Sequence, residues 1–306
     1  MLITNEVRIE PSTLCNYSCK ICPLSTGVFN RPRTVMSQNM FEKIIDKVRS
    51  QAPQINVCTL SGMGEVFTDA GIIAKSRYAA GLGFDVHILT NGSLLTEDLI
   101  DDLLAIPVAS IRISFHTPVQ DHYTSITGSQ VKYFKKLLLN IEYLAKNRGN
   151  TRLIITSDLT GKFLGDVEAI KEYCLPLVDL LEIWRPHNWG NWENFRKGRR
   201  QKLTCGRPFR GPLQIQVDGS VNMCCFDFNG ELLLGDFIKD SIKKIFSSYN
   251  YERIAKFHQD MGSNDNILCR NCDQLYPLDP SILVFNSGFK PEERINKTST
   301  IYQDLN

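Results

Sequence analysis

Apolar and polar residues follow two alternating patterns along the first two thirds of the chain. Short apolar runs, typical of buried strands, are separated by longer stretches that repeat apolar residues at helical spacing. The predicted strands are 7–10, 55–60, 85–89, 110–115, 152–156 and 180–184. The predicted helices between them are 37–52, 72–80, 96–106, 129–147 and 166–174. This alternation predicts parallel β/α units, and six of them are too few to close an eight-stranded barrel.

Polar residues follow several of these strands at the point where each strand ends. Parallel β/α folds bind ligands at the carboxyl ends of their strands, so such residues are candidates for a binding site. We single out Asn91, Ser114, His116, Asp158 and Arg185. Arg185 carries a planar fork of donors that suits a carboxylate or an oxygen-rich substrate. The alternatives are an Asn-Gly turn at Asn91, a structural histidine at His116 and a capping turn over 187–189.

Composition and charge narrow the class of partner. The 306 residues include 35 Lys and Arg against 33 Asp and Glu, a balance that favours neither nucleic acid nor an anionic membrane. We therefore expect a small-molecule or peptide substrate. The chain shows no apolar run of about eighteen residues and no signal-peptide pattern, so we expect a cytoplasmic protein. In that reducing compartment, ten cysteines indicate metal binding rather than disulfides.

Three of the cysteines stand close together after the first predicted strand. Cys15, Cys19 and Cys22 form a C-x-x-x-C-x-x-C motif, in which three soft thiolates can hold three irons of a cubic 4Fe–4S cluster. The fourth iron then lacks a protein ligand and is open to a small chelating molecule. A zinc knuckle is the alternative, although this stretch has no fourth Cys or His at a suitable spacing. The motif resembles that of the radical S-adenosylmethionine (SAM) superfamily.

The resemblance implies a fold, a cofactor and several binding residues. It implies an open barrel of six β/α units, with SAM bound to the open iron through its amino and carboxylate groups. Two glycines around Met63 allow the backbone to approach a ligand closely, and Glu65 can accept a hydrogen bond from an ammonium group. By itself this stretch could be an ordinary turn. Its resemblance to the Gly-Gly-Glu motif of the superfamily implies that SAM is bound at its methionine end by Gly62, Gly64 and Glu65.

Further roles follow from the same resemblance. It implies that Ser114 contacts the ribose or carboxylate of SAM, and that the Thr-Asn-Gly element at Asn91 belongs to the cofactor site. We also expect Arg185 to hold the carboxylate of SAM or the substrate. An electron donor such as flavodoxin or ferredoxin is implied as a partner.

A second group of cysteines lies at positions 205, 224, 225, 269 and 272. Two short runs, 213–217 and 221–224, are joined by Asp218-Gly219, a dipeptide favoured at hairpin turns. Predicted helices at 241–247 and 251–260 then lead to a C-x-x-C pair. The cysteines that can converge on one four-ligand metal site are Cys205, Cys224, Cys269 and Cys272. A zinc ribbon is one alternative, and Cys225 competes with Cys224 as the ligand after the hairpin.

This second arrangement resembles the twitch domain, a shortened SPASM domain, and the resemblance implies one auxiliary 4Fe–4S cluster on those four cysteines. The layout is similar to that of 2-deoxy-scyllo-inosamine dehydrogenases. We therefore expect an α/β fold, with a partial (β/α)6 barrel over 1–195 and the auxiliary-cluster domain over 196–276. The tail, 277–306, covers the barrel mouth or is disordered. The basic stretch 195–200 is a solvated linker or contacts a phosphorylated or nucleotide-linked substrate.

The resemblance implies radical chemistry, in which a 5′-deoxyadenosyl radical abstracts hydrogen from the substrate. We expect a small polyol, sugar or aminocyclitol that is dehydrogenated with the auxiliary cluster as electron acceptor. Epimerisation is an alternative, with Cys225 as a hydrogen donor, although Cys225 can equally be structural. Peptide maturation ranks lower because no extra domain precedes the barrel to bind a leader peptide. A protein that only stores or senses clusters would not need the stretch from Gly62 to Glu65.

Overall fold

We describe the protein from a computed structural model. The described residues are 4–190, 192, 199–261, 263 and 265–276, together with the backbone of two strands at 281–285 and 300–304. The expected boundary at 195/196, most of the basic stretch 195–200, and the side chains of the tail lie outside the described residues. The domain boundaries therefore remain a prediction.

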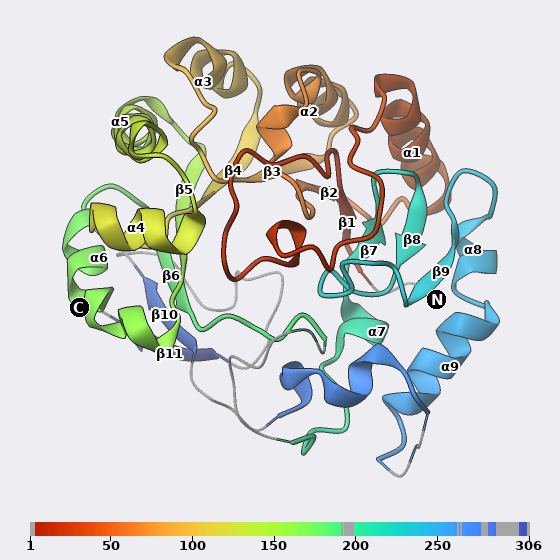
Figure 1. Cartoon of the computed structure of the whole chain (residues 1–306). Helices are drawn as coiled ribbons and strands as arrows, with labels where there is room; N and C mark the ends of the chain where they lie inside the picture. Colours follow the sequence, from red (N-terminus) through yellow and green to blue (C-terminus); the bar gives the residue numbers. More distant parts are fainter. Residues whose placement is uncertain are drawn as a thin grey trace.

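Six neighbouring parallel strands form the first part of the sheet, in the order of the chain. They are β1 (Glu6–Ile9), β2 (Val57–Leu60), β3 (Asp85–Thr90), β4 (Val108–Ser114), β5 (Arg152–Asp158) and β6 (Leu180–Trp184). The helices that connect or follow them are α1 (Gln38–Gln51), α2 (Ile72–Gly81), α3 (Glu97–Leu104), α4 (Gln120–Thr127), α5 (Val131–Asn147) and α6 (Val167–Cys174). Figure 1 shows these helices around the outside of the curved sheet. The expectation of six parallel β/α units is confirmed.

Local sequence explains why α1 begins and packs where it does. The Ser37 side chain accepts a hydrogen bond from the backbone N–H of Met40, which satisfies one free donor at the helix start. Phe41, Ile44 and Val48 are fully buried on one face, at the spacing of an amphipathic helix.

The hydrophobic pattern did not indicate α4, a short helix that ends at Gly128, where φ is 62°.

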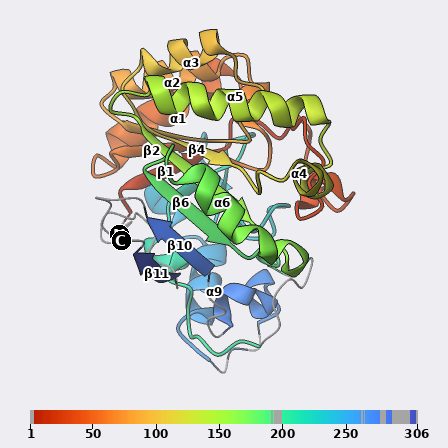
Figure 2. The same ribbon diagram turned by 90° about the vertical axis from the view of Figure 1, so that its left-hand side faces the viewer.

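The second cysteine group lies in a smaller unit that continues the same sheet. Its strands are β7 (Leu213–Ile215), β8 (Ser220–Asn222) and β9 (Leu233–Asp236), and its helices are α7 (Arg207–Arg210), α8 (Ile242–Ile245) and α9 (Tyr249–Phe257). The predicted hairpin is confirmed, with Gly219 in its turn at φ 86°. Because β7 pairs in parallel with β1, the hairpin stands directly beside the barrel. Figure 2 shows α9 of this unit at the opposite end of the molecule from α3.

The tail adds to the other edge of the sheet. β10 (Ser281–Phe285) pairs antiparallel with β6, and β11 (Thr300–Asp304) pairs parallel with β10, which gives a sheet of eleven strands. Short 3-10 helices lie at η1 (Pro23–Ser25), η2 (Val66–Thr68), η3 (Gly161–Asp166), η4 (Leu268–Asn271) and η5 (Asp273–Leu275). Among the described residues, no helix combines the length and apolar character needed to cross a bilayer.

Candidate functional site

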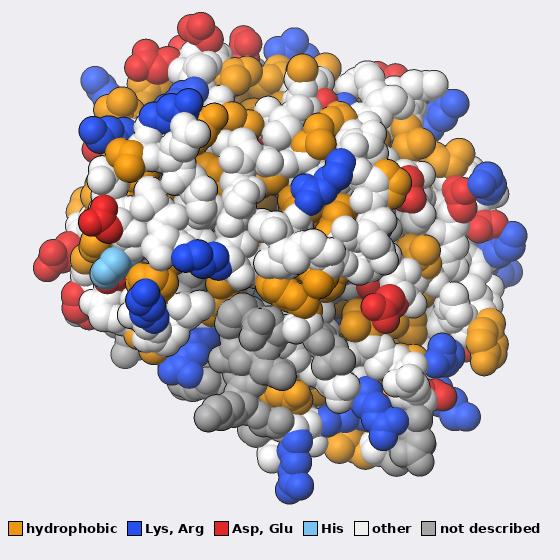
Figure 3. Space-filling view, viewed as in Figure 1, with side chains coloured by type: hydrophobic (Ala, Val, Ile, Leu, Met, Phe, Trp, Pro, Cys, Tyr) orange, Lys and Arg blue, Asp and Glu red, His pale blue; other side chains and the backbone are white. Residues whose placement is uncertain are grey.

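A cavity of about 340 Å³ lies where the strands of the barrel end. Both cysteine groups contribute to its wall, the first through Cys15, Cys19 and Cys22, and the second through Cys224 and Cys225. The other residues singled out from the sequence that line it are Gly62, Gly64, Glu65, Asn91, Ser114, His116, Asp158, His187 and Trp189. In Figure 1 the loop from β1 to α1, which carries the first cysteines, crosses the middle of this face. Figure 3 shows apolar side chains gathered there, with charged side chains of both signs scattered around them.

Backbone hydrogen bonds hold the loop of the first cysteines in place. The N–H groups of Ser18 and Lys20 donate to carbonyl oxygens at the end of α4, at 3.0 and 2.9 Å. The Glu65 N–H donates to the Leu14 carbonyl at 2.7 Å. Burial raises the pKa of all three thiols, and that of Cys22 to about 11. A metal that binds here therefore has to displace the thiol protons.

The two glycines of the Gly-x-Gly-Glu stretch serve packing within the protein. A Cβ on Gly62 would lie 2.2 Å from Cγ of Glu10, and one on Gly64 would lie 2.4 Å from the Leu14 carbonyl oxygen. The missing side chains thus make room for Glu10 and for the loop of the first cysteines. Both glycines also line the large cavity, so their contact with SAM stays a prediction.

Glu65 is 3% exposed and is fixed by three donors. One carboxylate oxygen accepts from the Phe67 N–H at 3.1 Å and the Thr90 hydroxyl at 2.5 Å, and the other accepts from the Asn91 N–H at 2.5 Å. Burial raises the pKa of Glu65, and these hydrogen bonds oppose the rise. The carboxylate is therefore held in one orientation at the cavity wall, where it can accept a further hydrogen bond.

Glu10 is a site residue that sequence reasoning missed. It is 2% exposed, and its carboxylate oxygens accept hydrogen bonds from the two terminal nitrogens of Arg31, at 2.7 and 2.8 Å. It also accepts from the N–H of Met63 at 2.9 Å and of Val217 at 3.0 Å. One buried ion pair thus joins β1, the Gly-x-Gly-Glu stretch and the hairpin. A glutamate directly after an apolar strand was the available signal, but its partners lie far away in the sequence.

The second cysteine group surrounds a smaller cavity of its own. Its wall includes the predicted ligands Cys205, Cys224, Cys269 and Cys272. Cys225 does not line this cavity but lines the large one, so the geometry agrees with Cys224 as the ligand after the hairpin. Within the described residues, no three Cys, His, Asp or Glu side chains are close enough to share a single metal ion. The ligands of a cubic cluster bind separate irons and therefore stand farther apart.

The loop after β6 contacts both cysteine groups. The Trp189 indole N–H donates to the Ile21 carbonyl at 2.9 Å, next to Cys22, and the Asn188 side chain donates to the Asn271 carbonyl at 2.7 Å, next to Cys272. Trp189 has φ 49°, a left-handed conformation that is strained for a residue with a side chain. The loop is therefore held by its contacts against its own backbone preference.

Aromatic side chains from this loop line the large cavity. The His187 ring lies 3.7 Å from that of Phe226, centroid to centroid, and 4.3 Å from that of Trp189. All three rings belong to the wall between the first cysteines and Cys225. Arg185, two residues before His187, does not line the cavity and is half-buried outside it. The structure thus brings together every predicted site residue near the first cysteines except Arg185.

Comparison with known proteins identifies both parts of the chain. A sequence profile of the radical SAM superfamily matches residues 9–174, and a profile of SPASM, an iron–sulfur cluster-binding domain, matches residues 205–273. The chain is 28% identical over 150 residues to the AdoMet-dependent heme synthase of Methanosarcina barkeri. That match covers 47% of this chain and 41% of the relative, so the chain spans less than half of the relative's length.

Solved structures share the fold. BtrN in complex with AdoMet and 2-DOIA has a TM-score of 0.64 and 14% identity, over 89% of this chain and 94% of BtrN. SuiB of Streptococcus suis, bound to its precursor peptide SuiA, has a TM-score of 0.69 and 12% identity, over 88% of this chain and 69% of SuiB. At these identities the similarity concerns the fold alone.

The two domains imply 4Fe–4S clusters and SAM as cofactors, and the side chains present fit them. Three thiols edge a cavity with room for a ligand, and four thiols surround the second cavity. Beside the second group, Nη1 of Arg207 is buried without a hydrogen-bond partner, as expected of a donor that faces an anionic cluster. Because the superfamily profile covers more than half of the chain, the protein belongs to the radical SAM superfamily and carries a SPASM domain.

Proposed function

We propose that this protein is a radical SAM oxidoreductase that dehydrogenates a small polyol, sugar or aminocyclitol. The observation that supports this most strongly is the single cavity lined by both cysteine groups. When bound, SAM and the first cluster supply a 5′-deoxyadenosyl radical, and the auxiliary cluster supplies an electron acceptor. A carbinol carbon would lose a hydrogen atom to the radical and then a proton and an electron, which leaves a carbonyl group.

Several of the predicted residues near the cavity take a role in this proposal. Cys15, Cys19 and Cys22 would hold the first cluster, and the four cysteines of the smaller cavity would hold the auxiliary cluster. Glu65, in its fixed orientation, would accept a hydrogen bond from the ammonium group of SAM. Asn91 and Ser114 would contact other polar groups of SAM from the ends of their strands. Arg185 does not line the cavity, so we assign it no role there.

The cationic side chains around the cavity disfavour an anionic substrate. Arg8 and Arg31 are the only Lys or Arg residues that line it among the described residues. Each is paired with a buried carboxylate, Arg8 with Glu6 and Arg31 with Glu10. With both cations neutralised, the cavity offers little to a phosphate or carboxylate group of a substrate. A molecule that is rich in hydroxyl groups and carries no anionic group suits it better.

A row of polar side chains can recognise such hydroxyl groups. Arg8 on β1 is in register with Gln214 on β7, which is in register with Asn222 on β8, and all three line the cavity. The amide oxygens of Gln214 and Asn222 are buried without hydrogen-bond partners. The Asn222 amide is oriented by its N–H, which donates to the Asp227 carbonyl at 2.8 Å. These unpaired acceptors would accept hydrogen bonds from hydroxyl or amino groups.

Epimerisation is the second candidate, and the position of Cys225 favours it. This thiol faces the large cavity rather than the smaller one, so it could return a hydrogen atom to a substrate radical. Peptide maturation is a third candidate, supported by the shared fold with SuiB bound to its precursor peptide. The neutral, hydroxyl-binding row keeps small polyols ahead of both.

Product analysis under reducing, anaerobic conditions separates these functions. The loaded protein is incubated with SAM and a panel of polyols, sugars and aminocyclitols, and 5′-deoxyadenosine and products are quantified. Dehydrogenation predicts one 5′-deoxyadenosine per ketone, and the Cys225→Ala variant remains active. Deuterium uptake from heavy water, lost in Cys225→Ala, would identify an epimerase instead. If no SAM is cleaved with or without substrate, the proposal of a radical enzyme fails.

A further inference from the structure

A half-buried cation stands beside the second cysteine group. Arg207 is the first residue of α7, and it lines the smaller cavity together with the four cysteines. Its Nη1 atom is buried and has no hydrogen-bond partner. In the described part of the chain, Arg207 also forms no ion pair with a carboxylate, in contrast to Arg8 and Arg31. Its charge therefore lacks the compensation that the two cavity arginines have.

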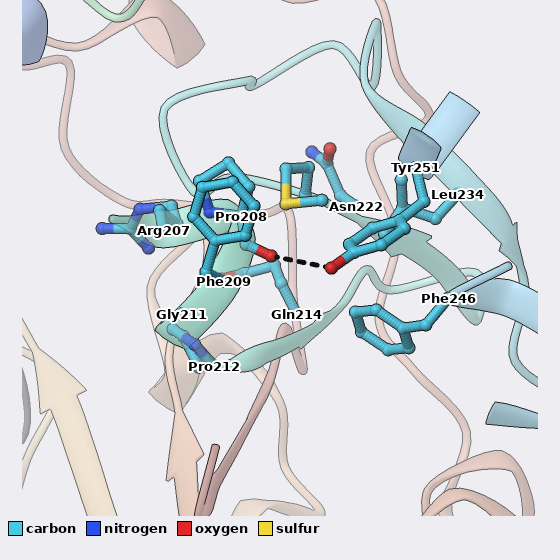
Figure 4. Close-up of a pocket in the computed structure, with 11 residues that line it drawn as sticks. Arg207, Pro208, Phe209, Gly211, Pro212, Gln214, Asn222, Leu234, Phe246 and Tyr251 are labelled. Atoms are coloured by element: carbon cyan, nitrogen blue, oxygen red, sulfur yellow. Dashed lines mark hydrogen bonds between the residues drawn. The ribbon is translucent and has the colours of Figure 1, made fainter. Parts of the chain in front are cut away.

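Neighbouring residues hold the Arg207 side chain in this position. A Cβ on Gly211 would lie 2.6 Å from Cγ of Arg207, so this glycine makes room for the arginine stem. The guanidinium carbon lies 5.4 Å from the centroid of Phe226, a distance suited to a cation–π interaction. Figure 4 shows the guanidinium directed away from Phe246 and Tyr251, whose hydroxyl donates to the Pro208 carbonyl at 3.4 Å. The side chain thus lies apart from these two rings, and it lines the cavity that the four cysteines share.

Cysteines line the smaller cavity beside Arg207. A guanidinium keeps its charge at any ordinary pH, so this side chain is a fixed cation beside them. Where little water screens it, a fixed positive charge strongly stabilises any negative charge that is added to a neighbouring group.

We propose that Arg207 raises the reduction potential of the auxiliary cluster and so keeps it an electron acceptor. Reduction adds one electron to the cluster, with no bond formed or broken, and makes it more negative by one charge. A fixed cation stabilises the reduced form more than the oxidised form. Hydrogen bonds and charge near cluster sulfurs are known means of setting this potential. The inference rests on the auxiliary cluster and not on the identity of the substrate.

The test is a redox titration of the anaerobically loaded chain, followed by electron paramagnetic resonance (EPR). The auxiliary signal is the one that does not respond to added SAM. In Arg207→Gln, the ratio of reduced to oxidised auxiliary cluster at a fixed potential should fall at least tenfold. For a one-electron couple this is a shift of about 59 mV to lower potential. Arg207→Lys, which keeps the charge, should shift less.

Arg210 provides the matched control, because it lies on the same short helix and is exposed. Arg210→Gln should leave the auxiliary potential unchanged, since water screens its charge. An auxiliary potential in Arg207→Gln equal to that of the parent protein would overturn the proposal. This result would be independent of whether any polyol is oxidised.

A second neutral variant keeps the test decisive if the first fails to fold. Arg207→Met replaces the half-buried cation with an apolar side chain of similar length, a change that proteins often tolerate. If neither neutral variant binds the auxiliary cluster but Arg207→Lys does, as judged by iron content and EPR, the charge itself is required. If all three variants fail while Arg210→Gln loads normally, the shape of Arg207 is what matters and the proposal is wrong.

Discussion

The two cysteine groups differ in number, access and surrounding charge. The first has three thiols on the edge of a cavity of about 340 Å³, and the arginines there are paired, as in Arg31 with Glu10, or exposed, as in Arg33. The second has four thiols around a smaller cavity, beside Arg207, whose Nη1 atom is buried without a hydrogen-bond partner. Three thiols leave room for an exogenous ligand, whereas four close the site. The uncompensated cation would in addition favour the reduced form of the second cluster.

Both sites use cysteine ligands, but on our proposals they would transfer electrons in different directions: the first cluster would donate an electron to SAM, and the second would accept one from the substrate. Without an unpaired cation beside it, the first cluster would keep a low reduction potential and remain a strong reductant toward SAM. With the Arg207 cation beside it, the second cluster would have a higher reduction potential and be the better electron acceptor. The wall shared by the two groups, including His187 and Phe226, would keep the substrate between them.

The largest effect is expected at Glu65, which has no counterpart at the second group. In its proposed role Glu65 accepts a charge-assisted hydrogen bond from the SAM ammonium group, worth roughly 1.5–3 kcal/mol, so affinity for SAM should fall about 10- to 100-fold in Glu65→Gln. Equilibrium dialysis of the loaded protein with labelled SAM measures this change. Glu97→Gln, on the exposed start of α3, is the control and should bind SAM normally. Unchanged affinity in Glu65→Gln would remove this residue from the SAM site.

The next effect concerns Gly190, in the loop that contacts both groups. Gly190 has φ 83°, and a Cβ there would lie 2.6 Å from Cγ of Leu268, directly before Cys269. Gly190→Ala should therefore cost about 2 kcal/mol of unfolding free energy, from backbone strain and the clash together. Urea denaturation measures it. Gly161→Ala, where a Cβ meets no atom within 4 Å, should change stability by less than about 0.5 kcal/mol. Equal stability of the two variants would show that the loop adjusts freely.

The smallest effect, counted per pH unit, is a pH dependence contributed by one buried histidine in each region. Burial lowers the pKa of His116, at the large cavity, to about 4. Burial and the charge of Arg200 likewise lower the pKa of His258, at the smaller cavity, to about 4. The unfolded chain takes up these protons below about pH 6.5, whereas the folded protein does not until about pH 4. Stability is therefore lost as pH falls through this interval, by about 1 kcal/mol per pH unit for each histidine.

Denaturation of the loaded protein at about pH 7.5, 6.5 and 5.5 tests this. His116→Gln and His258→Gln should each remove about half of the histidine-linked loss, with cluster retention followed by absorbance. If neither variant alters the slope, these histidines are protonated in the folded protein and our account of their burial is wrong.

The elements of the barrel could be predicted from the sequence because their signals are local. The cap at Ser37, the apolar face of α1 and the Asp218-Gly219 turn each depend on neighbouring residues. The three cysteines of the first group likewise stand within eight residues. Helix α4 was missed because its sequence is mostly polar: Tyr123 and Ile126 are its two apolar residues, too few to show a helical pattern.

The features of the fold and the site that could not be predicted depend on contacts between segments far apart in the sequence, which a single sequence does not reveal. The parallel pairing of β7 with β1 sets the hairpin beside the barrel, and only then does Glu10 reach Val217 and Arg8 align with Gln214. The left-handed Trp189 could not be anticipated either, since tryptophan disfavours that conformation. Arg185 was chosen for its chemistry, but the chain directs it away from the cavity wall.

The most direct test of the difference between the two groups is the response of each cluster to SAM. One variant carries Cys15, Cys19 and Cys22 as Ala, another carries Cys269 and Cys272 as Ala, and each is loaded anaerobically, reduced and examined by EPR before and after SAM is added. We predict about four irons per chain in each variant, with a spectrum that SAM alters only where the first group is intact. A response to SAM from the second group, or none from the first, would contradict the assignment of an open and a closed site.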